Sequence, residues 1–125
     1  MAPRSVFAKD LKIGVIGDED TVAGFLLAGV GDRDRDGNTN FKICNAKTPV
    51  AEIEEIFHAL TERQDIGMIL INQNVADRIR PLMDTYTEVI PSILEIPSKE
   101  CPYDPTKDSV MQRVKMFFGG TLPEN

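Results

Sequence analysis

The sequence contains no tryptophan, one histidine and only two cysteines. Cys44 and Cys101 lie far apart without a C-x-x-C spacing, and His58 is the single imidazole, so neither a disulfide scaffold nor a zinc site is expected. We therefore predict no metal site and two free thiols in a reducing compartment. Because aromatic residues make up only 6% of the chain, the core should consist of Ile, Leu, Val, Met and Ala.

Positive charge is also scarce, since 14 Lys and Arg residues stand against 20 Asp and Glu residues and the net charge is -6. A duplex binder needs a basic stripe that displaces counterions, so nucleic acid is not an expected partner. No apolar run approaches the roughly 20 residues that cross a bilayer. Residues 1–10 have no signal-peptide core. These absences predict a cytoplasmic protein, or one on the cytosolic side of a membrane, without direct membrane insertion.

Catalytic and cofactor motifs are missing as well. The chain has no G-x-x-x-x-G-K-[ST] phosphate loop, and Gly14-Val-Ile-Gly17 lacks the third glycine of a dinucleotide fingerprint. A Ser or Cys nucleophile would need His58 as its base, yet His58 lies in the apolar stripe region of a predicted helix. We predict no catalytic residue, no cofactor and no enzyme activity in this chain.

One segment opens like a calcium-binding loop. Residues 32–37 (DRDRDG) place carboxylates at positions one, three and five and a glycine at position six. Position twelve, which requires a bidentate Glu, is Ile43, and the segment that follows has the pattern of a strand. A solvated loop is the favoured interpretation.

Strand and helix patterns alternate over residues 12–96. Short apolar runs bounded by turn residues predict four strands: Lys12–Gly17, Phe41–Cys44, Ile66–Ile71 and Pro91–Ile96. The alternation with short connections predicts right-handed crossovers. The expected fold is therefore α/β, with a four-stranded, parallel, doubly wound sheet of the flavodoxin or receiver type.

Three helices are expected between these strands. Residues 21–30 suit a buried helix packed closely on the sheet, and Thr48 followed by Pro49 predicts a capped second helix. Asn72 and Asn74 can cap the third. Pro81 lies inside that third helix and should kink or split it, because proline removes a helical hydrogen bond.

The pattern changes after Ile96. Three prolines in residues 97–105 make residues 97–104 an extended linker, which separates an α/β domain of residues 1–96 from a C-terminal helix and tail of residues 105–125. Asp104-Pro105 predicts the start of that helix and Gly119-Gly120 its end. Its apolar side chains recur at helical spacing: Val110, Met111, Val114, Phe117 and Phe118.

Two interpretations of this helix remain open. It could fold back onto the sheet, or it could dock in a groove of another protein. The linker is longer than a tight fold-back requires, and two adjacent phenylalanines are strong anchors at an interface. We favour docking and predict that the five apolar residues of the helix bind a partner.

Asp18, Glu19 and Asp20 follow the first strand, like the acidic pocket of phosphorylatable receiver domains. Such a site needs an aspartate at the end of the third strand, where Asn72 stands, and an amide cannot attack a phosphoryl donor. The acids also suit the N-terminal turn of a helix. A degenerate receiver-like signalling or interaction module without phosphotransfer is the alternative function.

Several segments resemble the F-subunit of the eukaryotic V-type proton-pumping ATPase. They are residues 16–29 (IGDEDTVAGFLLAG), 65–73 (DIGMILINQ), 93–100 (ILEIPSKE), 102–105 (PYDP) and 107–110 (KDSV). The likeness spans roughly Lys12 to Phe118 and includes the Pro-rich linker. Cys101, where a histidine is expected, and Pro81 are departures from the family pattern.

The resemblance implies a non-catalytic component of the central rotor stalk, bound to the coiled-coil D-subunit of that stalk. Such a component helps couple ATP hydrolysis in the A and B ring to proton transport, on the cytosolic face of vacuolar or other endomembranes. It also implies that the C-terminal helix lies along the D-subunit coiled coil, where its apolar seam can pack knobs into holes.

Overall fold

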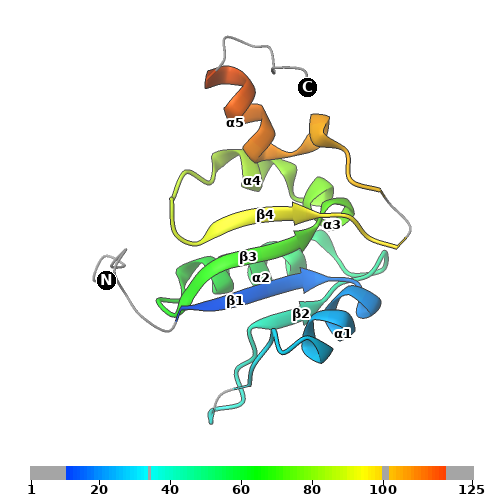
Figure 1. The fold of residues 1–125 in the computed structure, drawn as a ribbon, viewed down its shortest axis with the longest axis vertical. Helices are drawn as coiled ribbons and strands as arrows, with labels where there is room; N and C mark the ends of the chain where they lie inside the picture. Colours follow the sequence, from blue (N-terminus) through cyan, green and yellow to red (C-terminus); the bar gives the residue numbers. More distant parts are fainter. Residues whose placement is uncertain (1–10, 34, 100–101, 118–125) are drawn as a thin grey trace.

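The computed structural model describes residues 11–33, 35–99 and 102–117. Four strands form one sheet in the order β2-β1-β3-β4, and every pairing is parallel (Figure 1). The strands are β1 (Lys12–Gly17), β2 (Phe41–Ile43), β3 (Ile66–Asn72) and β4 (Ser92–Ile96). The predicted four-stranded parallel α/β fold is confirmed.

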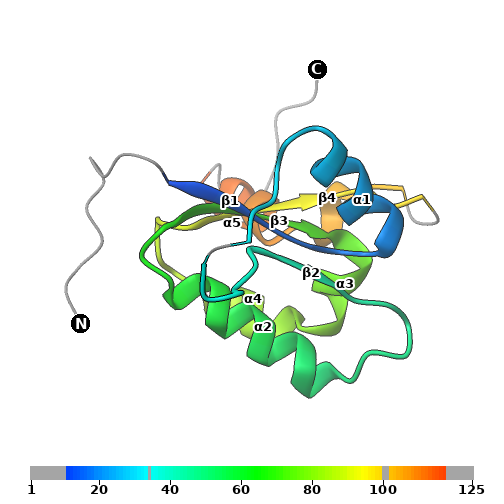
Figure 2. The same ribbon diagram turned by 90° about the horizontal axis from the view of Figure 1, so that it is seen from below.

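Helices lie on both faces of the sheet. Figure 2 shows α1 on one face and α2, α3 and α4 on the other. Their bounds are α1 (Glu19–Leu27), α2 (Val50–Glu62), α3 (Gln73–Arg78) and α4 (Arg80–Thr85). After β4 the chain forms the 3₁₀ turn η1 (Pro105–Lys107) and the helix α5 (Ser109–Phe117).

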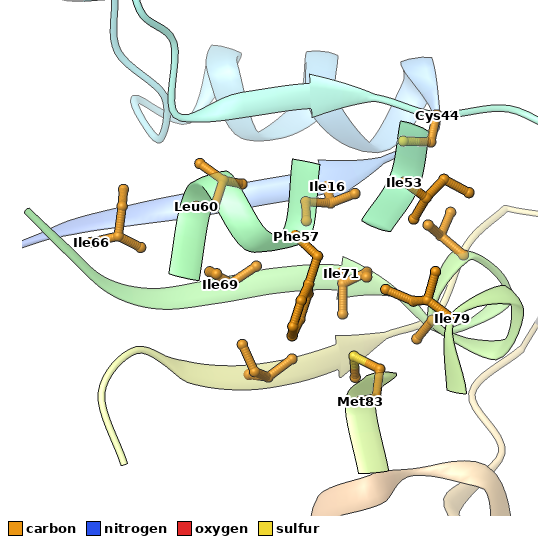
Figure 3. Packing of buried hydrophobic residues seen from close by; sticks show 13 residues of the cluster. Ile16, Cys44, Ile53, Phe57, Leu60, Ile66, Ile69, Ile71, Ile79 and Met83 are labelled. Atoms are coloured by element: carbon orange, nitrogen blue, oxygen red, sulfur yellow. The ribbon is translucent and has the colours of Figure 1, made fainter. Parts of the chain in front are cut away.

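The core lies between the sheet and α2. Ile53, Phe57 and Leu60 recur at helical spacing and point from α2 towards the strands, where they meet Ile69 and Ile71 of β3 (Figure 3). These side chains are fully or almost fully buried. This one-sided stripe explains why α2 is the longest helix among the described residues, since burial of an apolar face stabilises a helix more than propensity does.

The opposite face of the sheet is covered only in part. Side chains alternate along a strand, so the residues next to the core positions point to the α1 side. Ile13, Met68 and Leu94 lie there, and each is partly exposed to solvent. The expectation of a buried first helix is wrong: Val22 is the only buried residue of α1, and Leu27 is 90% exposed. Only one side of this short helix meets the sheet, so most of its apolar residues face solvent.

Helix starts also differ from expectation. Pro49, not Thr48, occupies the cap position of α2, and no side chain caps it. Asn72 precedes α3, but its side chain does not cap that helix because it is engaged elsewhere. The expected break at Pro81 is confirmed: α3 ends at Arg78 and α4 begins at Arg80, with the proline in its first turn.

Candidate functional site: the C-terminal arm

Four of the five predicted partner-binding residues lie on α5, which stands beyond the β4 edge of the sheet (Figure 1). Val110 is 40% exposed and Phe117 is 86% exposed, while Met111 and Val114 are partly exposed. Phe118 lies outside the described residues. None of the four described side chains is buried.

Sequence reasoning missed one member of this apolar surface. Met116 is 79% exposed and directly precedes Phe117. It lies outside the i, i+4, i+7 stripe, and for that reason the periodicity did not select it. The signal that could have found it is the short apolar cluster Met116–Phe117 at the end of the helix.

Two acidic residues organise the start of the arm, which comprises residues 102–117. Asp104 accepts the Thr106 N–H at 3.0 Å and so caps η1, and the hydrogen bonds to Thr106 lower the pKa of the Asp104 carboxyl. Asp108 is buried, and its Oδ1 accepts the Val110 N–H of α5 at 2.9 Å. The predicted helix start at Asp104-Pro105 therefore yields only a 3₁₀ turn, and α5 begins at Ser109.

Tyr103 holds this arrangement in place. Its hydroxyl donates to Oδ2 of Asp108 at 2.5 Å. Desolvation of the phenol raises its pKa, and the hydrogen bond to the Asp108 carboxylate raises it further. The tyrosine is therefore neutral, and remains a hydrogen-bond donor, over the whole physiological pH range.

The arm is attached to the α/β domain by specific polar contacts. The Gln73 side chain forms two hydrogen bonds with the backbone of Asp104. Lys107 lies 3.9 Å from a carboxylate oxygen of Asp77, an exposed pair of small energetic value. The guanidinium of Arg113 donates to the carbonyl oxygen of Tyr86. Asp104, Lys107 and Arg113 thus contact the α/β domain.

An apolar groove of about 410 Å³ lies where α5 leaves the domain. Its lining includes Met68 and Leu94 of the sheet, Val89 of the loop before β4, and Val110 and Arg113 of α5. The exposed apolar surface therefore runs from the first turn of α5 across the β4 edge to the partly covered face of the sheet.

Comparison with known families identifies the chain. The family model described as "ATP synthase (F/14-kDa) subunit" matches residues 13–114, which include all of the sheet except Lys12 and most of α5. This chain belongs to the F-subunit family of V-type proton ATPases.

Relatives in this family match nearly the full chain. It is similar to the V-type proton ATPase F-subunit of Dictyostelium discoideum, with 56% identity over 119 residues, 95% of this chain and 98% of the relative. The Xenopus laevis F-subunit is 55% identical over 104 residues, 83% of this chain and 94% of the relative. The Neurospora crassa F-subunit is 51% identical over 123 residues, 95% and 99% of the two chains.

In this F-family chain, the side chain at the position of the receiver aspartate is engaged in structural hydrogen bonds. Asn72 is fully buried, and its Oδ1 accepts the Asp18 N–H at 2.8 Å while its Nδ2 donates to the Pro97 carbonyl at 3.1 Å. The Asp18 side chain caps α1 by accepting the Thr21 N–H at 2.7 Å. A Cβ on Gly17 would lie 2.4 Å from Asn72 Oδ1, so the strand end tolerates only glycine there. An amide thus occupies the position of the receiver aspartate, and its contacts connect β1, β3 and the segment after β4.

Metal-binding and membrane-spanning features are absent from the described part of the chain. Across residues 11–33, 35–99 and 102–117, no three His, Cys, Asp or Glu side chains gather in a way that could hold a metal ion. No helix within these ranges combines the length and apolar character needed to span a bilayer. Cys44 is a buried free thiol, and burial raises its pKa, whereas Cys101 lies outside the described residues.

Proposed function

We propose that this chain is a non-catalytic component of the central rotor stalk of a V-type proton ATPase. It binds the coiled-coil D-subunit of the stalk through α5 and helps couple ATP hydrolysis in the A and B ring to proton transport. Its place is the cytosolic face of vacuolar or other endomembranes, as a peripheral part of the complex. The family membership and the similarity to F-subunits of V-type proton ATPases support the assembly.

The observation that carries the docking proposal is the exposure of apolar side chains on α5. Met116 and Phe117 face solvent almost fully, although the helix that bears them is anchored to the domain. Burying each such side chain against a partner contributes roughly 1.5–3 kcal/mol before ordering costs. An apolar seam on one helix is also what a coiled coil can accept by knobs-into-holes packing.

The test is a pair of matched substitutions in the full chain, Phe117→Asp and Leu27→Asp. Both side chains are apolar and nearly fully exposed, at 86% and 90%, but Leu27 lies on α1. Affinity for the D-subunit coiled coil is measured by titration calorimetry. We expect Phe117→Asp to weaken binding at least thirtyfold, about 2 kcal/mol, as anchor residues do. Leu27→Asp should change it less than threefold.

The melting temperature separates docking from fold-back. Because Phe117 is exposed, its replacement should leave the melting temperature of the free chain within about 2 °C of wild type. A large drop in melting temperature with intact binding would support a fold-back role for α5. Unchanged affinity in Phe117→Asp would overturn the docking proposal.

A further inference from the structure

The Gln73 side chain pairs with the backbone of Asp104 as a neighbouring strand would. Its Nε2 donates to the Asp104 carbonyl oxygen at 2.6 Å, and its Oε1 accepts the Asp104 N–H at 2.5 Å. Gln73 is only 3% exposed, so its amide is shielded from water where it meets the partly buried Asp104. A shielded polar group that loses its partner is costly, and the contact is therefore a specific attachment point for the arm.

A buried ion pair supports the Gln73 amide from the other side. Glu95 on β4 is 4% exposed, and its Oε1 accepts a weaker third bond from Gln73 Nε2 at 3.4 Å. The Arg80 guanidinium reaches both Glu95 oxygens, at 2.9 Å to Oε2 and 3.1 Å to Oε1. The carboxylate attracts the NH₂ group of Gln73 and so leaves the amide oxygen directed to the Asp104 N–H.

From Asp104 the contacts continue without a break into α5. The Asp104 carboxylate caps η1, and Asp108 follows the last residue of that turn. The Asp108 carboxylate accepts hydrogen bonds from the Tyr103 hydroxyl and from the Val110 N–H. Each of these bonds restricts the backbone between the domain and the helix. Contacts that begin at Gln73 therefore restrict the direction of α5, together with the Arg113 bond to the Tyr86 carbonyl.

We propose that Gln73 is a positioning residue that fixes the direction in which α5 leaves the α/β domain, with Glu95 and Arg80 as its support. A helix held by this clamp of Gln73 on Asp104 moves with its domain as one body, whereas a helix on a free linker does not. The clamp is a property of the free chain. In the complex, a partner that binds α5 therefore also determines the position of the α/β domain. This consequence rests on the proposed function.

The decisive variant is Gln73→Glu. At neutral pH the new carboxylate cannot donate to the Asp104 carbonyl and is repelled by the buried charge of Glu95. Protonation restores one donor and one acceptor in the geometry of the amide, so lowering the pH should close the clamp again. Gln64→Glu is the matched control, because it makes the same chemical change at an exposed position before β3.

The readout is a distance distribution between spin labels on α2 and α5, measured by pulsed electron resonance. Labels are placed at Glu55→Cys and Lys115→Cys, both exposed, in a Cys101→Ser chain whose buried Cys44 is confirmed by mass spectrometry to be unlabelled. We expect one narrow distance for wild type and Gln64→Glu at pH 7.5 and pH 5. Gln73→Glu should be broad at pH 7.5 and narrow at pH 5.

A second variant keeps the test decisive if Gln73→Glu does not fold at neutral pH. Gln73→Met preserves the volume of the side chain, removes both bonds and adds no charge, so it should fold and show a broad distribution at both pH values. A narrow distribution in folded Gln73→Met, or in folded Gln73→Glu at pH 7.5, overturns the proposal. These outcomes are read in the free chain and do not depend on whether the D-subunit binds.

The complex tests the consequence separately. With the D-subunit bound, Gln73→Met should keep its affinity within about threefold, because the apolar residues of α5 are unchanged. The distance between a label at Glu55→Cys and a label on the D-subunit should broaden. If wild type does not bind the D-subunit, the proposed function fails and the clamp is unaffected. If Gln73→Met binds and that distance stays narrow, the clamp does not set the place of the domain.

Discussion

The carboxamide oxygen of Asn72, at the end of β3, accepts the backbone N–H of Asp18, which follows β1, over 2.8 Å. The same side chain donates its amide hydrogens to the Pro97 carbonyl and the Thr21 hydroxyl. An amide accepts and donates at once in this place, whereas an ionised carboxylate can only accept. One buried residue therefore joins two strand ends, the start of α1 and the segment that leads to the arm.

Asn72→Asp should destabilise the fold, because a carboxylate keeps the acceptor but loses both donated bonds in a fully buried place. We expect a loss of about 3 kcal/mol in the free energy of unfolding, measured by urea denaturation at pH 7.5. The exposed Gln64→Glu change should stay within about 0.5 kcal/mol. Equal stability of the two variants would contradict a structural role for the amide.

Arg80 should be costly to remove alone and much less costly to remove together with its partner. Arg80→Met leaves the buried Glu95 carboxylate without its bidentate counterion, which costs about 3–5 kcal/mol. The double variant Arg80→Met with Glu95→Leu removes both charges and should recover most of that loss. A double-mutant cycle by urea denaturation measures the coupling. Additive effects of the two single changes would argue against a coupled pair.

Asp65 should make stability sensitive to acid. Hydrogen bonds from the Arg63 side chain, at 2.9 and 2.8 Å, hold the pKa of the Asp65 carboxyl below its usual range. Since the folded pKa is depressed, the stabilisation is fully present above the unfolded pKa of about 3.9 and is lost as pH falls through the folded pKa.

The measurement for Asp65 compares wild type with Asp65→Asn in urea titrations at a series of pH values. The advantage of wild type should be constant above about pH 5 and should shrink below about pH 4. Arg63→Met, which removes the donors instead of the acceptor, should weaken the same acid dependence. An advantage that does not change with pH would show that the ion pair contributes nothing at equilibrium.

Phe57→Ala should be among the most damaging core substitutions. Its ring is 1% exposed, lies between α2 and the sheet, and meets the Tyr86 ring edge-on at a centroid distance of 5.7 Å. We expect a loss of about 3–5 kcal/mol in the free energy of unfolding, seen as a clear drop in melting temperature. His58→Ala, one residue along and exposed, is the control and should change stability by less than about 0.5 kcal/mol.

The secondary structure and its order could be predicted from local patterns. Runs such as residues 66–71 are apolar and rich in isoleucine, which indicates a strand, and the α2 stripe identifies the face that forms the core. Pro81 could be placed at a helix break because its effect is covalent and local. The family resemblance could also be recognised, since it depends on the residues alone.

The arm shows where local patterns fail. Asp104-Pro105 has the form of a helix start, but the buried Asp108, bound by Tyr103, is the residue that receives the Val110 amide in the first turn of α5. Asp104 and Asp108 both precede α5, and the residue that accepts the N–H of its first turn is the one whose carboxylate is buried, Asp108. Met116 escaped detection for a related reason, since exposure depends on neighbours in space and not on periodicity.

The amino-acid sequence by itself determined the four strands, the α2 core face, the break at Pro81 and the family, because each depends on residues close together in the chain. The tertiary structure alone decided that Gln73 meets Asp104, 31 positions away, and that Asn72 meets Asp18, 54 positions away. A glutamine or an asparagine has no periodic signature. Its role appears only when folding removes water and leaves polar groups of the protein as the partners of its amide.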